Sequence, residues 1–172
     1  GLDRGIILST GPVSNAQGPN DLTDASGDFS DTSGDADLNL LATGQVRDAV
    51  GIEFDFVPLD SFVTFRYVFA SEEYCEFVGS IYNDVFGFFI SGPGIEGDFA
   101  DGAENVALIP GTDDYVAIND VNHTSNSQYF IRNELPDDAA QCGLSSTNWP
   151  TRDLIQYDGF TRRLTARLKL SP

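Results

Sequence analysis

The stretch that most constrains the fold runs from residue 61 to residue 94, SFVTFRYVFASEEYCEFVGSIYNDVFGFFISGPG. In residues 61–70, apolar side chains occupy every second position from Val63, while polar side chains such as Thr64 lie between them. This two-residue period predicts a half-buried strand. Residues 84–91 are apolar on both faces, which predicts a strand in the middle of a sheet.

Strand patterns recur along the rest of the chain. The sequence holds 13 Phe, no Met, and 17 Gly with 8 Pro, a mixture that favours strands joined by tight turns. The remaining predicted strands are residues 5–9, 51–58, 105–109, 128–132 and 160–170, and a polar loop is predicted at 134–148. We therefore expect an all-β fold, an antiparallel, jelly-roll-like β-sandwich with long acidic loops, as a single domain over residues 1–172.

Charge limits the partners. The chain has 27 acidic and 9 basic residues and a formal net charge of -18, so it lacks the basic footprint that nucleic acids and anionic membrane surfaces require. No apolar run is long enough for a membrane helix, and we expect no membrane insertion. Two interpretations of the acidity stay open: a solubilising surface, or carboxylate clusters that bind Ca²⁺.

The last predicted strand is basic. Residues 152–172 carry five of the nine basic side chains and two acidic ones, a net charge of 5 − 2 = +3. Within it, Leu164 and Leu168 alternate with basic side chains, which are Arg163, Arg167 and Lys169. Such a strand either pairs within its own sheet or docks on the next copy of the protein, and the second contact would grow head to tail into a filament.

The two cysteines, Cys75 and Cys142, lie in polar loops. A disulfide between them is favoured, with two free thiols as the alternative. Because structural disulfides persist in oxidising compartments, this pairing would place the protein outside the cytosol, secreted or at the cell surface.

Two acidic regions are candidate calcium sites. The first combines the loop after the central strand with a distant turn, and its predicted ligands are Glu72, Glu73, Asp84 and Asp158. The second is the polar stretch 14–37, where Asp31 and Asp35 are the predicted ligands. An EF-hand beginning at Asp24 would require Gly and Glu where Phe29 and Asp35 stand, so the second region is either an irregular Ca²⁺ site or a solvated loop with Asx-turns.

The central string FASEEYCEFVGSIYNDVFGFFISGPG resembles the choice-of-anchor L domain family. Four further pieces resemble it in the same order: GIILSTG, VALIPGT, AINDVN and YDGFT. The resemblance implies an extracellular, β-rich bacterial module, secreted or attached to the surface, with no established catalytic chemistry. Family members normally contain sequence before Gly1 and a further strand or two after Leu170, so we expect a domain incomplete at both ends. Another subunit's strand could complete an open sheet edge by β-augmentation.

An enzyme is disfavoured by the arrangement of the acids and of the one histidine. Glu72 and Glu73 are adjacent and would point to opposite faces of a strand, and His123 has no nucleophile motif near it. We therefore expect a non-catalytic structural module for cell-surface adhesion or self-assembly into filaments, stabilised by Ca²⁺. The alternative is a module that binds a surface glycan, with Trp149 as a stacking platform rather than a packing residue, and a secreted hydrolase ranks below both.

Overall fold

Short antiparallel strands form the framework of the computed structural model, which describes residues 2–27, 34–42 and 44–170. The strands are β1 (Phe62–Tyr67), β2 (Ala70–Ser71), β3 (Val85–Phe86), β4 (Phe89–Ile90), β5 (Glu104–Asn105), β6 (Val116–Ala117), β7 (Phe130–Arg132), β8 (Gly159–Thr161) and β9 (Leu164–Lys169). They pair as β1–β9, β2–β8–β7, β3–β6 and β4–β5. The few helices are short. The all-β prediction is confirmed, and the sandwich and jelly-roll arrangement stays a prediction.

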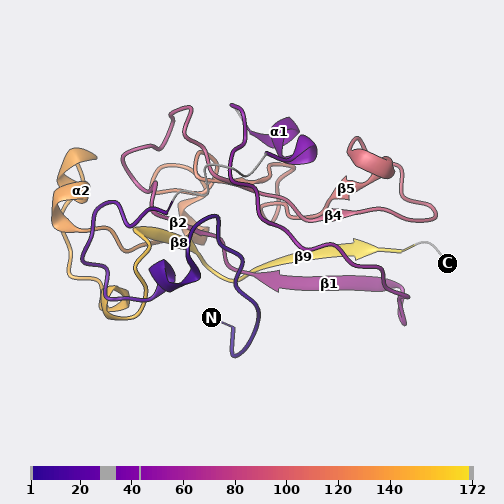
Figure 1. Cartoon of the computed structure of the whole chain (residues 1–172), viewed down its shortest axis with the longest axis horizontal. Coiled ribbons are helices and arrows are strands. Elements are labelled where there is room, and N and C mark those ends of the chain that lie inside the picture. Colours follow the sequence, from indigo (N-terminus) through magenta and orange to yellow (C-terminus); the bar gives the residue numbers. More distant parts are fainter. Residues whose placement is uncertain (1, 28–33, 43, 171–172) are drawn as a thin grey trace.

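The longest pairing joins β1 to β9, and the two strands form a ribbon that extends toward the C-terminal end of the molecule (Figure 1). Exposure alternates along both strands as the sequence predicted: Leu164 and Ala166 are buried, and their neighbours are exposed. The guanidinium of Arg167 lies 3.9 Å from the centre of the Phe62 ring on the opposite strand. The basic strand therefore pairs within its own chain along one edge.

The predicted strand 160–170 is divided in two. Its first part, β8, lies between β2 and β7, while β9 follows after Arg162 and Arg163 and pairs with β1. Because of this division, the segment 160–170 contributes a strand to each of two sheets. It also places Arg162 beside β7, where its backbone N–H donates to the carbonyl of Tyr129.

The central run 84–91 is not one interior strand, and that prediction is wrong. It is broken between β3 and β4, and each of these short strands has a single partner strand in the described residues. The break occurs at Gly87, where a Cβ atom would lie 2.5 Å from the ring of Phe89. The close approach of this ring fills the space that a continuous strand would need for a side chain.

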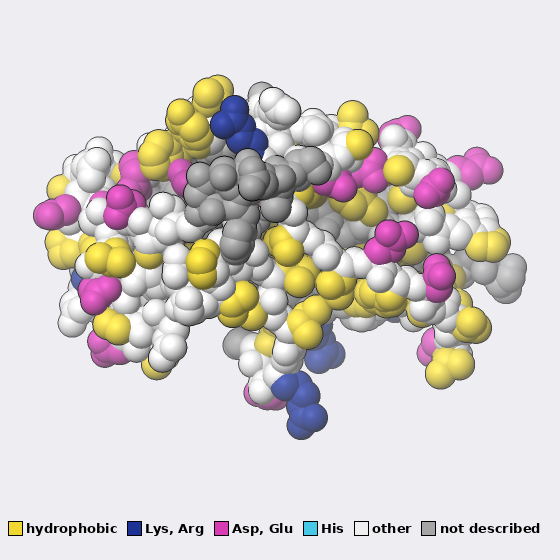
Figure 2. All heavy atoms as spheres, viewed as in Figure 1, with side chains coloured by type: hydrophobic (Ala, Val, Ile, Leu, Met, Phe, Trp, Pro, Cys, Tyr) yellow, Lys and Arg dark blue, Asp and Glu magenta, His cyan; other side chains and the backbone are white. Residues whose placement is uncertain are grey.

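Two predicted strands are absent from the described part of the chain. Residues 5–9 and 51–58 form no ladder, and their apolar side chains lie in solvent, with Ile6 74% and Val57 85% exposed. Figure 2 shows hydrophobic side chains spread over one face of the molecule, with Asp and Glu toward both ends of the long axis. Alternation gives these segments a strand pattern, but a strand forms only where a partner edge is available.

The helical elements are α1 (Ala36–Leu41), α2 (Pro136–Gln141) and the 3₁₀ turns η1 (Val13–Ala16), η2 (Ala100–Gly102), η3 (Ser127–Tyr129) and η4 (Pro150–Asp153). Helix α2 lies in the stretch predicted as a polar loop. Pro136 occupies its first turn, and Asp137 and Asp138 follow. Proline suits the start of a helix, and acidic side chains there interact favourably with the helix dipole, so local chemistry accounts for this helix.

The hydrophobic core gathers residues from the middle and the end of the chain: Tyr74, Ile109, Val116, Ile118, Val121, Phe130 and Leu164. Tyr74 is fully buried, its ring packs 4.6 Å from that of Phe130, and its hydroxyl donates to the carbonyl of Val121 at 2.8 Å. The acidic loop that carries Tyr74 is thereby fixed to the core.

Candidate metal centre

Glu72 and Glu76 come from the loop after β2, which turns back through residues 74–79. The N–H of Phe77 donates to the carbonyl of Glu73, and the N–H of Val78 donates to the carbonyl of Cys75. Both glutamates lie near Asp158, because their charges add to burial in raising the pKa of the Asp158 carboxyl.

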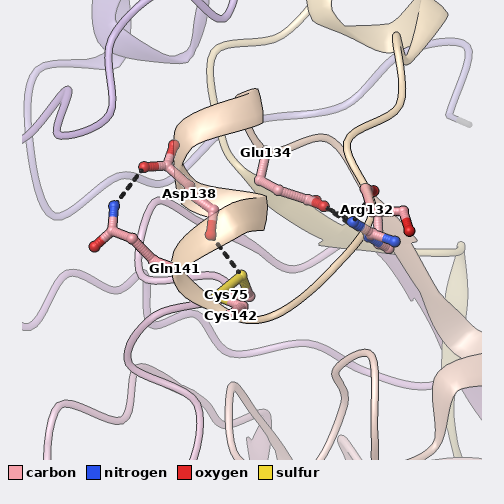
Figure 3. Close-up of a disulfide and its surroundings, with 7 residues drawn as sticks. Cys75, Arg132, Glu134, Asp138, Gln141 and Cys142 are labelled. Carbon is pink, nitrogen blue, oxygen red and sulfur yellow. Dashed lines mark hydrogen bonds and ion pairs between the residues drawn. A yellow bond between two sulfur atoms is a disulfide. The ribbon is translucent and has the colours of Figure 1, made fainter.

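The disulfide predicted between Cys75 and Cys142 is present, and it brings Asp138 to this turn. It links the loop to the end of α2, and the sulfur of Cys75 lies 3.6 Å from the carbonyl oxygen of Asp138. Figure 3 shows Asp138 and Gln141 on α2 beside the disulfide, with Glu134 directed toward Arg132. The disulfide therefore joins two acidic segments 67 residues apart.

Asp158 comes from the turn before β8 and is fully buried. Its Oδ1 accepts a hydrogen bond from Nδ2 of Asn20 at 2.8 Å, and its backbone N–H donates to Oε2 of Glu72 at 3.1 Å. The backbone of Asn133 donates to its carbonyl at 2.8 Å. Four segments of the chain thus meet at Asp158, and Asn20 is the one that contacts its carboxylate.

The acid cluster consists of Glu72, Glu76, Asp138 and Asp158. In each of these side chains one carboxylate oxygen is buried and has no hydrogen-bond partner in the described residues. Asp138 and Asp158 are both 0% exposed. Buried polar atoms are nearly always satisfied, so four unsatisfied oxygens in one place need a partner.

The distances within the cluster suit one cation. Oxygens of Glu76, Asp138 and Asp158 all lie within 4.8 Å of one another. Two ligands of the same Ca²⁺, each about 2.3–2.6 Å from it, lie at most about 5 Å apart. All candidate ligands are hard oxygens, and Cys75 and Cys142 are unavailable as thiolate ligands because they form the disulfide. This donor set fits Ca²⁺ better than a transition metal.

Burial makes ionisation of the empty cluster costly. It raises the pKa of Asp158 to about 9, with further contributions from Glu72, Asp138 and Glu76. It also raises the pKa of Glu72 to about 7, and the pKa values of Glu76 and Asp138 lie above their ordinary values for the same reason. A divalent cation would replace the water that these carboxylates have lost.

The six predicted ligands are separated by the fold. Glu72 and Asp158 meet in the acid cluster, whereas Asp84 lies elsewhere and accepts a hydrogen bond from the Ser71 hydroxyl at 2.7 Å. Glu73 is close enough to Asp84 for charge repulsion to add to burial, and its pKa rises to about 7. Glu73 and Asp84 therefore form a second acidic pair.

Of the two predicted ligands of the N-terminal region, the structure describes Asp35, which joins neither group. Asp35 caps α1, and its Oδ1 accepts hydrogen bonds from the N–H groups of Asp37 and Leu38 at 2.9 and 2.8 Å. Asp31 lies outside the described residues. A metal at this region stays a prediction.

The sequence analysis missed Glu76 and Asp138 as candidate ligands. A usable signal existed: Glu76 is adjacent to Cys75, and Asp138 precedes Cys142 by one helical turn. If the two cysteines pair, these acids must approach each other. The signal was lost because residues 134–148 were predicted as a loop without a helix.

The family model of the choice-of-anchor L domain matches the whole length of the chain, residues 1–172. The chain belongs to the choice-of-anchor L domain family. Family membership indicates a non-enzymatic surface module of a secreted or cell-surface bacterial protein. No curated protein and no solved structure matches the chain. No helix in the described ranges has the length and apolar character of a membrane span.

Proposed function

We propose that this choice-of-anchor L domain is a non-catalytic extracellular structural module that binds Ca²⁺ at the acid cluster and is stabilised by it. Two observations carry the proposal: four buried carboxylate oxygens have no partner among the described residues, and one oxygen each of Glu76, Asp138 and Asp158 lies within 4.8 Å of the other two. Extracellular modules commonly bind Ca²⁺ with dissociation constants of about 10⁻⁴–10⁻³ M. Ca²⁺ at the cluster would tie the 72–76 turn, α2 and the turn before β8 into one unit.

Calorimetric titration of the purified, metal-free chain with Ca²⁺ and Mg²⁺ tests this proposal. We expect one Ca²⁺ per chain and weaker Mg²⁺ binding, because Mg²⁺ demands octahedral geometry and retains its waters. Asp138→Asn should weaken Ca²⁺ binding at least tenfold. Asp137→Asn is the matched control, since Asp137 is exposed one position away and its substitution removes the same charge.

Equal Ca²⁺ affinity in the two variants would contradict the assignment of the site. Equal affinity would show that only diffuse surface charge attracts the ion. No saturable binding by the unmodified chain at millimolar Ca²⁺ would contradict the proposal itself.

We further propose that the module self-assembles, and that surface adhesion follows from the resulting array. The support is the pair of exposed strand-like segments, residues 5–8 and 52–57, whose large apolar side chains have no cover in the described structure. Monomeric proteins rarely leave large contiguous apolar surfaces exposed. A second copy of this chain would cover them.

Charge and periodicity favour pairing of the 52–57 segment with the free edge of β9. One edge of β9 is paired with β1, and its other edge has no strand partner among the described residues. Arg167 and Lys169 are exposed along β9, and Glu53 and Asp55 are exposed at the same two-residue spacing. An added strand that continued the apolar face would bring these opposite charges together. Repeated from copy to copy, this contact builds a filament.

Light scattering over a concentration series tests assembly. Species well above 18.6 kDa should form, and a chain with Arg167→Glu and Lys169→Glu should stay monomeric. Mixing it with a chain that carries Glu53→Lys and Asp55→Lys should restore association. Arg4→Glu with Arg47→Glu is the control, because both side chains are exposed outside the strands. A monomer at all concentrations, with and without Ca²⁺, would refute self-assembly.

A further inference from the structure

A hollow of about 370 Å³ lies beside β7, and none of its lining residues belongs to the acid cluster. Two arginines, a histidine and the one tryptophan of the chain contribute to its lining: Arg132, Arg162, His123 and Trp149. No Asp or Glu lines it, although the chain has 27 acidic residues and 9 basic ones. Its size falls within the usual range of small-ligand sites. Because Arg132 is paired with Glu134, Arg162 supplies the positive charge of this partly aromatic recess that is unpaired within the described residues.

Several polar groups of the hollow lack partners. Nε1 of Trp149 and Nδ1 of His123 are buried and have no hydrogen-bond partner in the described residues. The indole N–H can only donate, so it requires an acceptor. An unsatisfied buried donor is unfavourable, so this wall of the hollow is not self-sufficient in hydrogen bonding.

The arginines are positioned by other contacts. Nε and Nη2 of Arg132 donate to the Glu134 carboxylate, and its guanidinium lies 5.2 Å from the centre of the Trp149 ring. Nε of Arg162 donates to the carbonyl of Gln128 at 2.9 Å. No described residue accepts a hydrogen bond from either terminal nitrogen of Arg162. Arg162 is therefore oriented but keeps donors for an anion.

We propose that this hollow binds a uronic acid residue of an acidic polysaccharide. The carboxylate of the sugar would accept charge-assisted hydrogen bonds from the free terminal nitrogens of Arg162. The apolar part of the lining, including Phe130 and Leu144, suits the C–H faces of a pyranose ring. A neutral sugar would leave the arginine donors unused, whereas a compact inorganic anion would leave the apolar walls uncovered. The inference is independent of the calcium site and of self-assembly.

Fluorescence gives a direct test, because Trp149 is the only tryptophan. Titration with tetragalacturonate should change the emission saturably. The fully methyl-esterified tetrasaccharide, in which each carboxylate is replaced by a neutral methyl ester, should bind at least tenfold more weakly. Poly-glutamate should also bind at least tenfold more weakly, because it offers carboxylates without a sugar ring.

Arg162→Gln should weaken tetragalacturonate binding at least tenfold, while Arg163→Gln should change it less than twofold. The two substitutions remove the same charge at neighbouring positions, and Arg163 is exposed outside the hollow. If Arg162→Gln does not fold, Arg162→Lys replaces it in the test, because lysine keeps the positive charge. We expect Arg162→Lys to weaken tetragalacturonate binding, because it lacks the planar guanidinium that donates two parallel hydrogen bonds. The proposal is overturned by an absence of saturable change, by equal binding of the ester or of poly-glutamate, or by equal effects at Arg162 and Arg163.

Discussion

The stability of the metal-free protein should fall as pH rises from about 4 to about 9, and Ca²⁺ should remove most of this fall. Burial raises the pKa of Glu72 to about 7 and that of Asp158 to about 9, so the folded state holds protons that the unfolded state releases. Below both unfolded pKa values the groups are protonated in either state and cost nothing. Above the unfolded pKa values, the unfolded chain releases these protons, while the folded protein must either keep them or bury charged carboxylates. The free energy of unfolding therefore declines until the pH passes the folded pKa values.

The expected loss of stability can be calculated from the difference between the unfolded and folded pKa values. Glu72 has an ordinary pKa of 4.5 and a folded pKa of about 7. One pKa unit corresponds to about 1.4 kcal/mol, but Glu72 is partly exposed and solvent screens its charge, so this residue alone accounts for a loss of about 1–2 kcal/mol between about pH 4.5 and pH 7. Asp158 extends the decline toward pH 9. Ca²⁺ at about 100 times its dissociation constant would return about 2.7 kcal/mol.

Urea unfolding at about pH 5 and about pH 8, in metal-free buffer and with saturating Ca²⁺, measures this directly. Without metal, the protein should be less stable at the higher pH. With Ca²⁺, the difference should shrink, and the gain should appear mainly at the higher pH because the ligands must be deprotonated.

Asp158→Asn removes the charge while keeping the shape of the side chain. In metal-free buffer this variant should depend less on pH than the unmodified chain, and Ca²⁺ should stabilise it little. Asp137→Asn should behave like the unmodified chain, because Asp137 is exposed. A metal-free protein whose stability rises between about pH 5 and pH 8 would refute the reasoning, since buried carboxylates with raised pKa values require the opposite slope.

Three further substitutions separate structural contributions. Replacing Cys75 and Cys142 together by Ser should reduce stability by about 4 kcal/mol, from a closed loop of 67 residues, and should weaken Ca²⁺ binding in calorimetry; unchanged Ca²⁺ affinity would argue against the link to the acid cluster. Asp35→Ala should cost about 1 kcal/mol in urea unfolding through loss of the cap of α1, with no change in Ca²⁺ stoichiometry; a lost equivalent of Ca²⁺ would reveal a second site. Tyr74→Phe should cost about 1–3 kcal/mol because the carbonyl of Val121 loses its buried donor, and an unchanged unfolding midpoint would contradict this contact.

Much of the local structure was predictable because it depends on neighbouring residues. The alternation in β1 and β9 required their inward faces to be apolar, and both strands have the predicted exposure pattern. The disulfide between Cys75 and Cys142 followed from the presence of two cysteines in polar loops. The prediction failed for residues 51–58, where the same alternation is present but no strand in the described part of the chain pairs with the segment.

Only part of the acid cluster could be found in the sequence. Glu72 and Asp158 were identified by the oxygen ligands they offer, but 27 acidic residues provide many possible groupings. Asp138 belongs to the acid cluster because it lies on α2, and the disulfide links the end of α2 to the loop that holds residues 72–76. Asp84 lies outside the acid cluster, because it accepts a hydrogen bond from Ser71 and is paired with Glu73 instead.

The sequence by itself determined which residues alternate as strands, which segments are acidic or basic, and the family to which the chain belongs. The tertiary structure decided which carboxylates meet, which edge β9 uses, and that Arg132, Arg162 and Trp149 share one hollow. The physical reason is the range of the interactions. Strand periodicity is a property of the local backbone, whereas burial, pKa and ligand sets depend on contacts between segments far apart in the chain.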